Sequence, residues 1–428
     1  MNTINEEIVE LAGYRLHIVK TNKFKTVTMV LQFCAPLEES TVTKRALLAH
    51  LLKSSTKKSP TSQQLQHRLD DLYGASLASQ VQKKGHYHVL SIQINTANEK
   101  FLSESSSLLT ESLHLLAEAV LEPNVTEQGA FDEAVFQREK RALRQRLLAV
   151  YDDKMRYASE RLIDEMCAGE PFALHTNGTL EALEALTPTD VYDYYLEMLK
   201  TNSVDLYIVG DVDSDVIQSE LKTLLHFNQN EHRPIGRLQD VDKRVVEPKY
   251  IKESQDIEQG KLNLGYRTHV VVGDPLYPAS QVFNGLFGGF PHSKLFMNVR
   301  EKASLAYYAV SRNESFKGLM LVMSGIEFAN YDQALDIIHE QFKAMQEGAF
   351  SDHEIDQTKA LLINSTLEAL DSPFSVIDLL YQQVLSNDAL VLDEWFDDIH
   401  RVNREDIIKV AQQTQLDTVY FLQGKERA

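Results

Sequence analysis

The distribution of apolar residues divides the chain into short strand-like runs and longer helical runs. β-Branched and aromatic residues dominate the segments 13–19 (GYRLHIV) and 27–35 (VTMVLQFCA), as is typical of strands. Residues 75–94 (ASLASQVQKKGHYHVLSIQI) hold two alternating runs on either side of a turn at Lys83 to Gly85, which predicts a hairpin. Residues 101–123 and 131–166 repeat their apolar positions with helical spacing and without an internal proline, and 203–212 (SVDLYIVGDV) reads as a strand. These patterns predict a mixture of strands and helices.

The same order of patterns returns in the second half of the chain. The sequence predicts a strand at 259–268, a helix at 277–287, a hairpin at 305–327 and a long helix at 331–347. The later helices align best, since Phe131 precedes Lys140 by the same spacing as Phe350 precedes Lys359. The segment 187–211 finds a shorter counterpart in 402–424. We therefore predict two copies of one α+β unit, each of about 200 residues.

A polar stretch separates the two copies. Residues 226–249 (HFNQNEHRPIGRLQDVDKRVVEPK) are rich in charged and amide side chains, which is typical of a linker. We expect an N-terminal unit at 1–225, a linker at 226–250 and a C-terminal unit at 251–428. A duplicated pair often closes around a cavity, where ligands bind, although a duplication can also merely build a larger core.

Composition and charge limit the kinds of molecule that this protein is expected to bind. With 62 acidic and 43 basic residues the net charge is −19, which disfavours broad contact with nucleic acid or anionic lipid and favours protein or peptide. No run approaches the roughly 20 apolar residues that span a bilayer, and the first residues lack a secretory pattern. Cys34 and Cys167 match neither a disulfide framework nor a thiolate zinc motif. We expect a cytoplasmic protein without membrane association, with both thiols buried and reduced.

Candidate catalytic chemistry is sparse. The motifs GxxxxGK[ST], GxSxG and HExxH are absent from the sequence. The helical segment 44–56 (KRALLAHLLKSST) carries one histidine, His50. On a helix with HxxEH, two histidines and a glutamate share one face, so the imidazoles can hold zinc while the glutamate activates its water. His50 could be the remnant of such a site or only a polar residue on a helix.

Two other groups of residues are candidate binding sites. His86 and His88 share one face of a probable strand and could bind a metal, but without an acidic or cysteine partner nearby a polar strand face is favoured. A basic stretch could meet an acidic peptide, although most such stretches are solvated helix faces. The stretch comprises Arg138, Lys140, Arg141, Arg144 and Arg146.

The order of landmarks along the chain resembles that of the inverzincin peptidases: insulinase, pitrilysin and the mitochondrial processing peptidases. The landmarks are GYRLHIVKTN (13–22), LLAHLLKSS (47–55), DDLYGASL (70–77), GTLEALEALTPTDVYDYYLEML (178–199), LYIVGD (206–211) and GLFGGFPHSKLFMNVREKASLAYYAVS (285–311). The resemblance covers nearly the whole chain and is greatest to the bacterial branch in which two subunits divide the work. It implies two homologous α+β domains, each a mainly antiparallel sheet packed against helices, that form a half-clamshell.

The resemblance also implies that the metal site is degenerate. The family helix places Ala46 at the first histidine ligand, Ala49 at the glutamate base and His50 at the second histidine. The third ligand falls at Arg146, with Glu139 at the preceding family glutamate. Methyl and guanidinium groups cannot donate a lone pair to zinc, and a lone imidazole lacks the three protein ligands of a catalytic zinc. We therefore expect no metal and no cofactor in this chain, and we interpret His50 as a relic.

The second half retains other family residues. Arg300 and Tyr307 match an arginine and tyrosine pair that, by resemblance, reaches across the cavity to the main chain of a substrate near the scissile bond. A guanidinium and a phenol are fixed donors that can hold or polarise a carbonyl oxygen. Alternatively, Arg300 forms a surface ion pair and Tyr307 packs on a strand. Residues 284–296 correspond to a glycine-rich loop that recognises substrate, where Gly288 and Gly289 would permit close approach of an extended peptide, although most two-glycine loops are turns.

We conclude from the sequence that this is a non-catalytic, zinc-free subunit, inactive alone. Its expected partners are a homologous HxxEH-containing subunit, which would carry the zinc, and a peptide or unfolded protein substrate; the isolated chain could form a homodimer. The alternative is a structural or scaffold protein of the same fold, as the core proteins of respiratory complexes look within this family. An autonomous enzyme that uses another site has little support.

Overall fold

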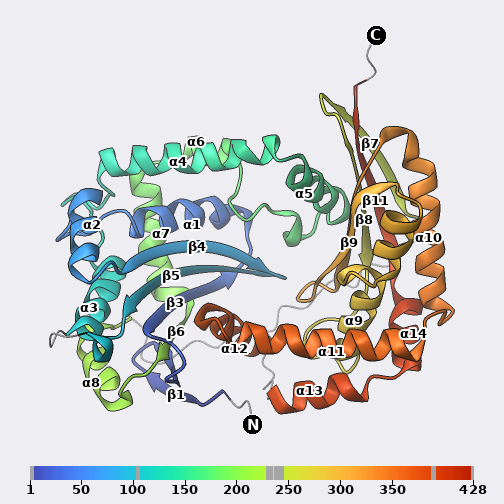
Figure 1. Cartoon of the computed structure of the whole chain (residues 1–428). Coiled ribbons are helices and arrows are strands. Elements are labelled where there is room, and N and C mark those ends of the chain that lie inside the picture. The colour runs from blue at the N-terminus through green and yellow to red at the C-terminus, as the bar shows by residue number, and fades with distance from the viewer. Residues whose placement is uncertain (1–3, 103–106, 228–234, 236–244, 387–391, 426–428) are drawn as a thin grey trace.

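The computed structural model describes residues 4–102, 107–227, 235, 245–386 and 392–425, which form two β-sheets packed with helices (Figure 1). The six strands of the first sheet are β1 (Glu6–Leu11), β2 (Tyr14–Lys20), β3 (Thr26–Pro36), β4 (Ser76–Lys84), β5 (Tyr87–Ala97) and β6 (Ser203–Gly210). The five strands of the second are β7 (Lys249–Gln255), β8 (Gly260–Arg267), β9 (Ala306–Glu314), β10 (Leu319–Ile326) and β11 (Gln415–Gly424). The predicted α+β class is confirmed.

The strand orders of the two sheets are copies of one another. The first sheet has the order β1-β2-β6-β3-β5-β4 and the second the order β7-β11-β8-β10-β9. Once β1 is set aside, the orders match strand by strand. In each sheet the first pair is parallel (β2 with β6, β7 with β11) and the following pairs are antiparallel. The duplication inferred from the sequence is therefore visible in the topology, and both sheets are mixed but mainly antiparallel.

The helices of the first half, apart from α5, cover one face of its sheet. The helices of this half are α1 (Glu39–Leu52), α2 (Ser62–Asp71), α3 (Leu108–Leu121), α4 (Glu133–Asp152), α5 (Lys154–Met166), α6 (Leu180–Ala185), α7 (Pro188–Thr201) and α8 (Ser214–Leu224). The expected single helix at 131–166 is wrong in one respect, because it divides at Asp153. The Asp153 carboxylate accepts a hydrogen bond from the backbone N–H of Arg156 at 3.1 Å and so caps a new helix, α5.

The second half has a corresponding set of helices. They are α9 (Tyr277–Asn284), the π-helical segments η3 (Gly285–Gly289) and η4 (Phe296–Lys302), and α10 (Tyr331–Gln346), α11 (Asp352–Ala369), α12 (Pro373–Ser386), α13 (Leu392–Arg401) and α14 (Arg404–Gln413). Short 3-10 turns are η1 (Glu99–Phe101), η2 (Pro171–Ala173) and η5 (Phe328–Asn330). Within the described ranges no helix is both long and apolar enough to cross a membrane.

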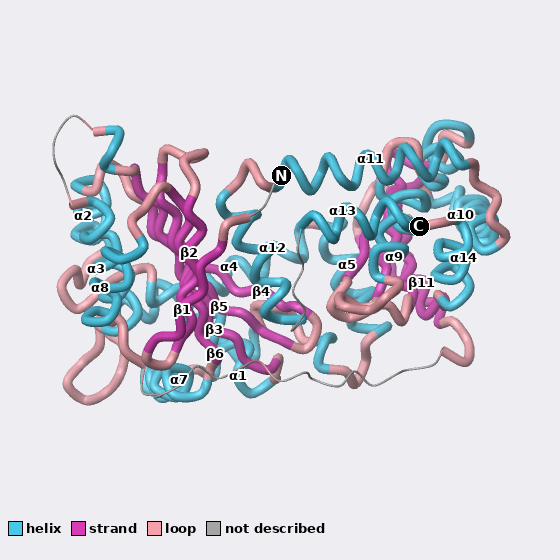
Figure 2. The backbone as a smooth tube through the Cα atoms, turned by 90° about the horizontal axis from the view of Figure 1, so that it is seen from below, coloured by secondary structure: helices cyan, strands magenta, loops and turns pink. Residues whose placement is uncertain are grey.

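Each half contributes one helix to the sheet of the other half. Leu162 and Met166 of α5 are buried against the second sheet, in a cluster with Leu319. In return, Leu380 and Tyr381 of α12 are buried against the first sheet. Both crossings are visible between the sheets in Figure 1, and Figure 2 shows α12 beside the first sheet and α5 beside the second. The predicted thiols Cys34 and Cys167 are free and buried in these two clusters.

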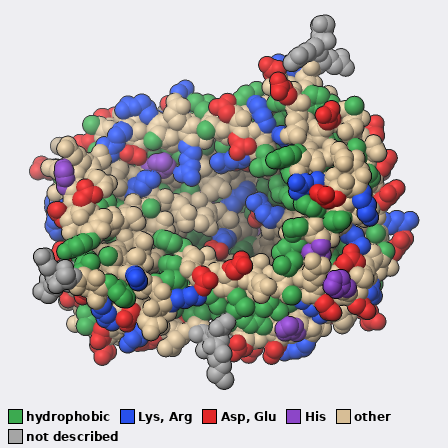
Figure 3. All heavy atoms as spheres, in the orientation of Figure 1, with side chains coloured by type: hydrophobic (Ala, Val, Ile, Leu, Met, Phe, Trp, Pro, Cys, Tyr) green, Lys and Arg blue, Asp and Glu red, His purple; other side chains and the backbone are tan. Residues whose placement is uncertain are grey.

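The predicted domain limits at 1–225 and 251–428 stay a prediction. Helices α5 and α12 each lie within one predicted unit but pack against the sheet of the other unit. The linker predicted at 226–250 lies largely outside the described residues, and β7 already begins at Lys249. Figure 3 shows a deep hollow at the centre of the molecule, between the two halves. The two sheets thus form the walls of a shared depression, as expected for a half-clamshell.

Candidate functional site

The degenerate metal helix α1 packs against α4 and brings His50 to Glu139. Nδ1 of His50 lies 3.5 Å from Oε2 of Glu139, and the two side chains are 13% and 11% exposed. Burial alone would raise the pKa of Glu139, but its hydrogen bonds with His50 and Arg138 outweigh burial and lower that pKa. His50 is therefore not an isolated polar residue, because its ring nitrogen contacts the Glu139 carboxylate in the place where the resemblance puts a metal.

The rest of the metal face is filled by core packing. Ala46 and Ala49 are 1% and 2% exposed and belong to the hydrophobic core of the first half. The carbonyl of Ala49 accepts a hydrogen bond from the Ser79 hydroxyl at 2.5 Å, which holds β4 against α1. The two positions that carry a ligand and a base in the family therefore serve packing in this chain.

The resemblance places Arg146 at the third ligand and Glu139 at the preceding family glutamate, and both residues lie on α4. Arg146 is exposed, and it lies two helical turns beyond Glu139, roughly 10 Å along α4. The acidic side chain beside His50 is thus Glu139. No group of three or more His, Cys, Asp or Glu side chains suited to a metal ion occurs in the described part of the chain. His50 and Glu139 supply two donors where a catalytic zinc needs three protein ligands, so the residues present do not fit that metal.

The two other candidate sites from the sequence are engaged in packing. His88 is fully buried, and its Nε2 lies 3.0 Å from the carbonyl oxygen of Thr176. Burial, with the nearby Arg45 guanidinium, lowers the pKa of His88 to about 3, so the imidazole is neutral. The expectation of a polar strand face is wrong for His88, and His86 precedes β5 rather than lying in it.

The basic stretch on α4 is partly used within the molecule. Lys140 donates to the carbonyls of Glu184 and Leu186 at 2.8 and 3.1 Å, and Arg144 pairs with the Glu184 carboxylate at 3.0 Å. Arg138 pairs with Glu139 at 2.8 Å, whereas Arg141 and Arg146 are exposed. Much of this stretch therefore anchors neighbouring elements instead of forming a continuous basic surface.

Arg300 lies near the end of η4 in the second half. Its guanidinium stacks over the Phe296 ring at 4.6 Å from the centroid, which orients the side chain. Nε is 3.8 Å from Oε1 of Glu301, and the two side chains are 41% and 50% exposed. Such a long contact between solvated groups contributes little free energy. Arg300 is therefore oriented but remains available to a ligand.

Tyr307 occupies a β-bulge in the edge strand β9. The register passes from Tyr308 opposite Gly325 to Ala306 opposite Ile326, which makes Tyr307 the extra residue. Tyr307 is 79% exposed, whereas the neighbouring Tyr308 is half-buried and burial raises its pKa to about 12. The alternative that Tyr307 packs on the strand is wrong. The bulge turns its phenol outward, toward solvent.

The two glycines predicted to lie in a substrate-recognition loop are helical. Gly288 and Gly289 end the π-helical segment η3, which continues α9. Gly288 is buried, and a Cβ added there would lie 2.6 Å from the backbone nitrogen of Ser311 in β9. Gly289 is exposed, and its Cβ would lie 3.1 Å from the side-chain nitrogen and 3.2 Å from the backbone oxygen of Asn284. The close approach that Gly288 permits is therefore an internal one, between η3 and the strand that carries Tyr307.

The edge strands of the two sheets approach each other at their hairpin tips. A Cβ added at Gly85, between β4 and β5, would lie 2.7 Å from the carbonyl oxygen of Phe316, between β9 and β10. Beside this contact Lys84 pairs with Asp378 of α12 at 3.0 Å. In the described chain β4 pairs only with β5, and β9 only with β10. Each therefore keeps an open edge, to which an extended peptide can add as a further strand.

A buried charge network joins the halves behind these tips. Glu170 follows α5, and its carboxylate accepts hydrogen bonds from Arg267 of β8 at 2.6 Å and Lys317 at 2.9 Å. Arg267 also donates to Asp417 of β11 at 2.7 Å. Burial would raise the pKa of Glu170, but the two cations outweigh it and lower the pKa. The sequence offered no signal for this network, because its members are distant along the chain.

Comparison with known proteins gives one family description and several relatives. Residues 185–362 match the family described as "Peptidase M16 inactive domain". The chain is 47% identical, over 100% of both chains, to a Bacillus subtilis protein named "Probable inactive metalloprotease YmfF". It is 22% identical to the "Uncharacterized zinc protease YmxG" of the same organism, over 67% of this chain and 69% of the relative. A crystal structure of a conserved protein from Enterococcus faecalis V583 superposes with a TM-score of 0.92 and 36% identity, covering 99% of this chain and 100% of that one.

Proposed function

Because the chain belongs to the M16 (pitrilysin/insulinase) metallopeptidase family, as an inactive homologue, we propose that it is the non-catalytic subunit of a heterodimeric peptidase in the cytoplasm. Its partner would be a homologous subunit with an intact HxxEH helix, which carries the zinc and the general base. This chain would supply Arg300, Tyr307 and half of the peptide chamber. Its substrate would be a peptide or an unfolded protein.

The exposed phenol of Tyr307 is the observation that carries this proposal. Burying a large apolar side chain is worth about 1.5–3 kcal/mol, and a largely exposed ring forgoes most of that stabilisation. Here a β-bulge holds the ring 79% exposed, while Tyr308 beside it is half-buried. The bulge and the stacked Arg300 support a site that binds a group from outside the chain, whereas the described residues of the first half include no group suited to hold a metal ion.

The two donors suit the main chain of a peptide. A guanidinium and a phenol hydroxyl both donate hydrogen bonds, and neither accepts a proton easily, so together they hold a carbonyl oxygen and stabilise the negative charge that develops on it. The open edge of β4 or β9 would align an extended peptide through backbone hydrogen bonds. Catalysis would then be shared but asymmetric, with positioning by this chain and bond cleavage by the partner.

The test is hydrolysis of an unfolded peptide by the chain alone, by the partner alone and by the pair. We expect activity only from the pair. Losing one oxyanion donor typically lowers kcat by roughly 100- to 1000-fold, so Arg300→Ala and Tyr307→Phe should each lower kcat/KM of the pair to a comparable extent. Tyr308→Phe and Arg312→Ala are matched controls on the same strand and should leave activity unchanged.

Two outcomes would contradict the proposal. Hydrolysis by the pair that survives both Arg300→Ala and Tyr307→Phe unchanged would remove the assisting role and leave a scaffold function. Stoichiometric zinc in the purified chain, with hydrolysis in the absence of any partner, would show instead that the chain is an enzyme by itself.

A further inference from the structure

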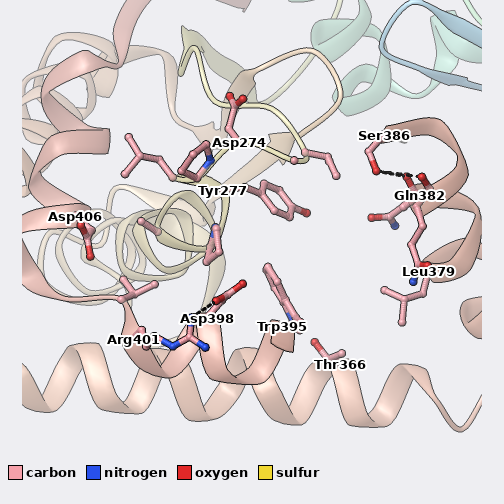
Figure 4. A pocket seen from close by; sticks show the side chains of 18 residues that line it. Asp274, Tyr277, Thr366, Leu379, Gln382, Ser386, Trp395, Asp398, Arg401 and Asp406 are labelled. Atoms are coloured by element: carbon pink, nitrogen blue, oxygen red, sulfur yellow. Dashed lines mark hydrogen bonds and ion pairs between the residues drawn. The ribbon is translucent and has the colours of Figure 1, made fainter. Parts of the chain in front are cut away.

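A separate cavity of about 580 Å³ lies in the second half, and neither Arg300 nor Tyr307 lines it (Figure 4). Its walls come from residues 272–279, which lead into α9, from α11, α12 and α13, and from Asp406 of α14. This volume falls within the range of roughly 300–1,000 Å³ that is typical of small-molecule sites. The cavity belongs to no feature used in the proposed peptidase function, so its role is a separate question.

Two aromatic rings form one side of the cavity. Tyr277 of α9 and Trp395 of α13 have centroids 5.5 Å apart and planes inclined by 36°. Figure 4 shows both rings reaching into the space, with Gln382 and Ser386 of α12 across from them. The faces of tyrosine and tryptophan rings attract cations, and tryptophan does so most strongly.

The charged side chains of the wall are mainly acidic. Asp274, Asp398 and Asp406 line the cavity, and Arg401 is the one cation among the described lining residues. Arg401 is already paired with Asp398 at 2.7 Å, so its charge is largely compensated. The outer face of α13 adds the exposed side chains of Asp393, Glu394 and Asp397. This surplus of carboxylates disfavours an anionic ligand and attracts a positive one.

We propose that this cavity binds an organic cation, an alkylammonium or alkylguanidinium group, against the rings of Tyr277 and Trp395, where Asp398 is shared with Arg401 and the net negative charge of the wall is the counter-charge. The aliphatic part of the ligand would contact Leu379 and the ring faces, and the glutamine and serine side chains of α12 would accept its N–H groups. The same group occurs in free amines and on lysine or arginine side chains of a polypeptide, so the test has an arm for each source.

Trp395 makes the test direct, because it is the only tryptophan in the chain. Its fluorescence therefore reports on this cavity without background from other indoles. We would titrate the full chain with agmatine, and with N-butylurea as a neutral compound of similar shape. Agmatine should change the fluorescence saturably, and N-butylurea should not.

Variants then locate the bound cation. Loss of a cation–π contact or of a counter-charge should lower the affinity about three- to tenfold, which is roughly 0.7–1.4 kcal/mol. We expect that loss for Tyr277→Leu and for Asp398→Asn. Tyr277→Phe, which keeps the ring, and Asp393→Asn, on the outer face of α13, should bind agmatine like the wild type. Melting curves identify any variant that fails to fold. In that case the comparison of agmatine with N-butylurea on the unmodified chain still tests the proposal.

A flat titration, or an equal response to N-butylurea, would overturn the proposal. So would agmatine binding that is unaffected by both Tyr277→Leu and Asp398→Asn, because the cation would then bind elsewhere. A blocked arginine tripeptide distinguishes the two sources: tighter binding than agmatine assigns the site to a polypeptide side chain, and weaker binding assigns it to a free amine.

Discussion

Replacing Glu170 with glutamine should destabilise the protein strongly, because the Glu170 carboxylate bridges two buried cations. In the native structure Arg267, Lys317, Glu170 and Asp417 contribute two positive and two negative charges, and their side chains are 5%, 2%, 9% and 4% exposed. Glu170→Gln keeps the shape of the side chain but changes the summed charge of these four side chains from zero to +1.

The contacts that change give the expected magnitude. Glu170 accepts charge-assisted hydrogen bonds from Arg267 at 2.6 Å and from Lys317 at 2.9 Å, and bonds to charged groups contribute about 1.5–3 kcal/mol each. Removing one partner of a buried pair typically costs about 3–5 kcal/mol. Since glutamine retains one acceptor oxygen, we expect the lower end of that range, about 3 kcal/mol in the free energy of unfolding.

Urea-induced unfolding, followed by circular dichroism, measures this loss. The matched control is Glu184→Gln, which removes an ion pair with Arg144 in which both partners are about half exposed, 56% and 49%. Exposed pairs contribute about 0–1 kcal/mol. A loss for Glu170→Gln no larger than that of the control would refute the reasoning that the network is energetically coupled.

The stability difference between wild type and Glu170→Gln should depend on pH, and the direction of that dependence tests the role of Glu170. The pKa of Glu170 is lowered in the folded state by Arg267 and Lys317, against the effect of burial. Its stabilisation is therefore present above the unfolded pKa of about 4.3 and is lost as pH falls through the lower folded value. The difference in stability between wild type and Glu170→Gln should shrink below about pH 4, and a difference that grows there would contradict the assignment.

Three further predictions test other parts of the molecule. Ala46→His places a second imidazole one turn before the existing one, so it should bind zinc measurably by calorimetry, and the added Glu139→Gln should abolish that binding. Two carboxylates of α5 raise the pKa of His175 to about 9, so His175→Gln should cost stability at pH 6 but not at pH 10, because the contribution of a raised pKa is lost as pH rises through 9. Gly288→Ala should lower the free energy of unfolding by about 1–3 kcal/mol through a clash with β9, whereas Gly289→Ala, measured in the same urea series, should cost less.

The interior strands and most helices could be predicted because their side chains repeat with one period. The strands β3, β5, β8 and β10 are buried between neighbours and carry continuous or alternating apolar residues. The edge strands β1 (EEIVEL) and β7 (KYIKESQ) were missed. Each faces solvent along one side and is rich in charged side chains, so the apolar signal is absent.

The site was predicted less completely, because it depends on contacts between distant segments. The family resemblance identifies Ala46, Ala49 and Arg146 as the positions of metal-site residues, and their side chains alone show that they cannot bind a metal. The pairing of His50 with Glu139 depends on how α1 lies against α4, which no local pattern encodes. Likewise, the exposure of Tyr307 follows from a register shift against β10, a property of two strands together.

The exchange of α5 and α12 between the halves affects the solubility of each half on its own and the motion of the halves relative to each other. If either half were produced as a separate polypeptide, the apolar face of its sheet that the exchanged helix normally covers would be exposed to solvent. Burying each large side chain of that face is worth about 1.5–3 kcal/mol. Fragments cut within the predicted linker, residues 226–250, should therefore aggregate when produced separately and become soluble only when mixed. For the same reason the two lobes of one chain resist hinging apart, so any opening that admits a long substrate would have to come from rocking against another molecule.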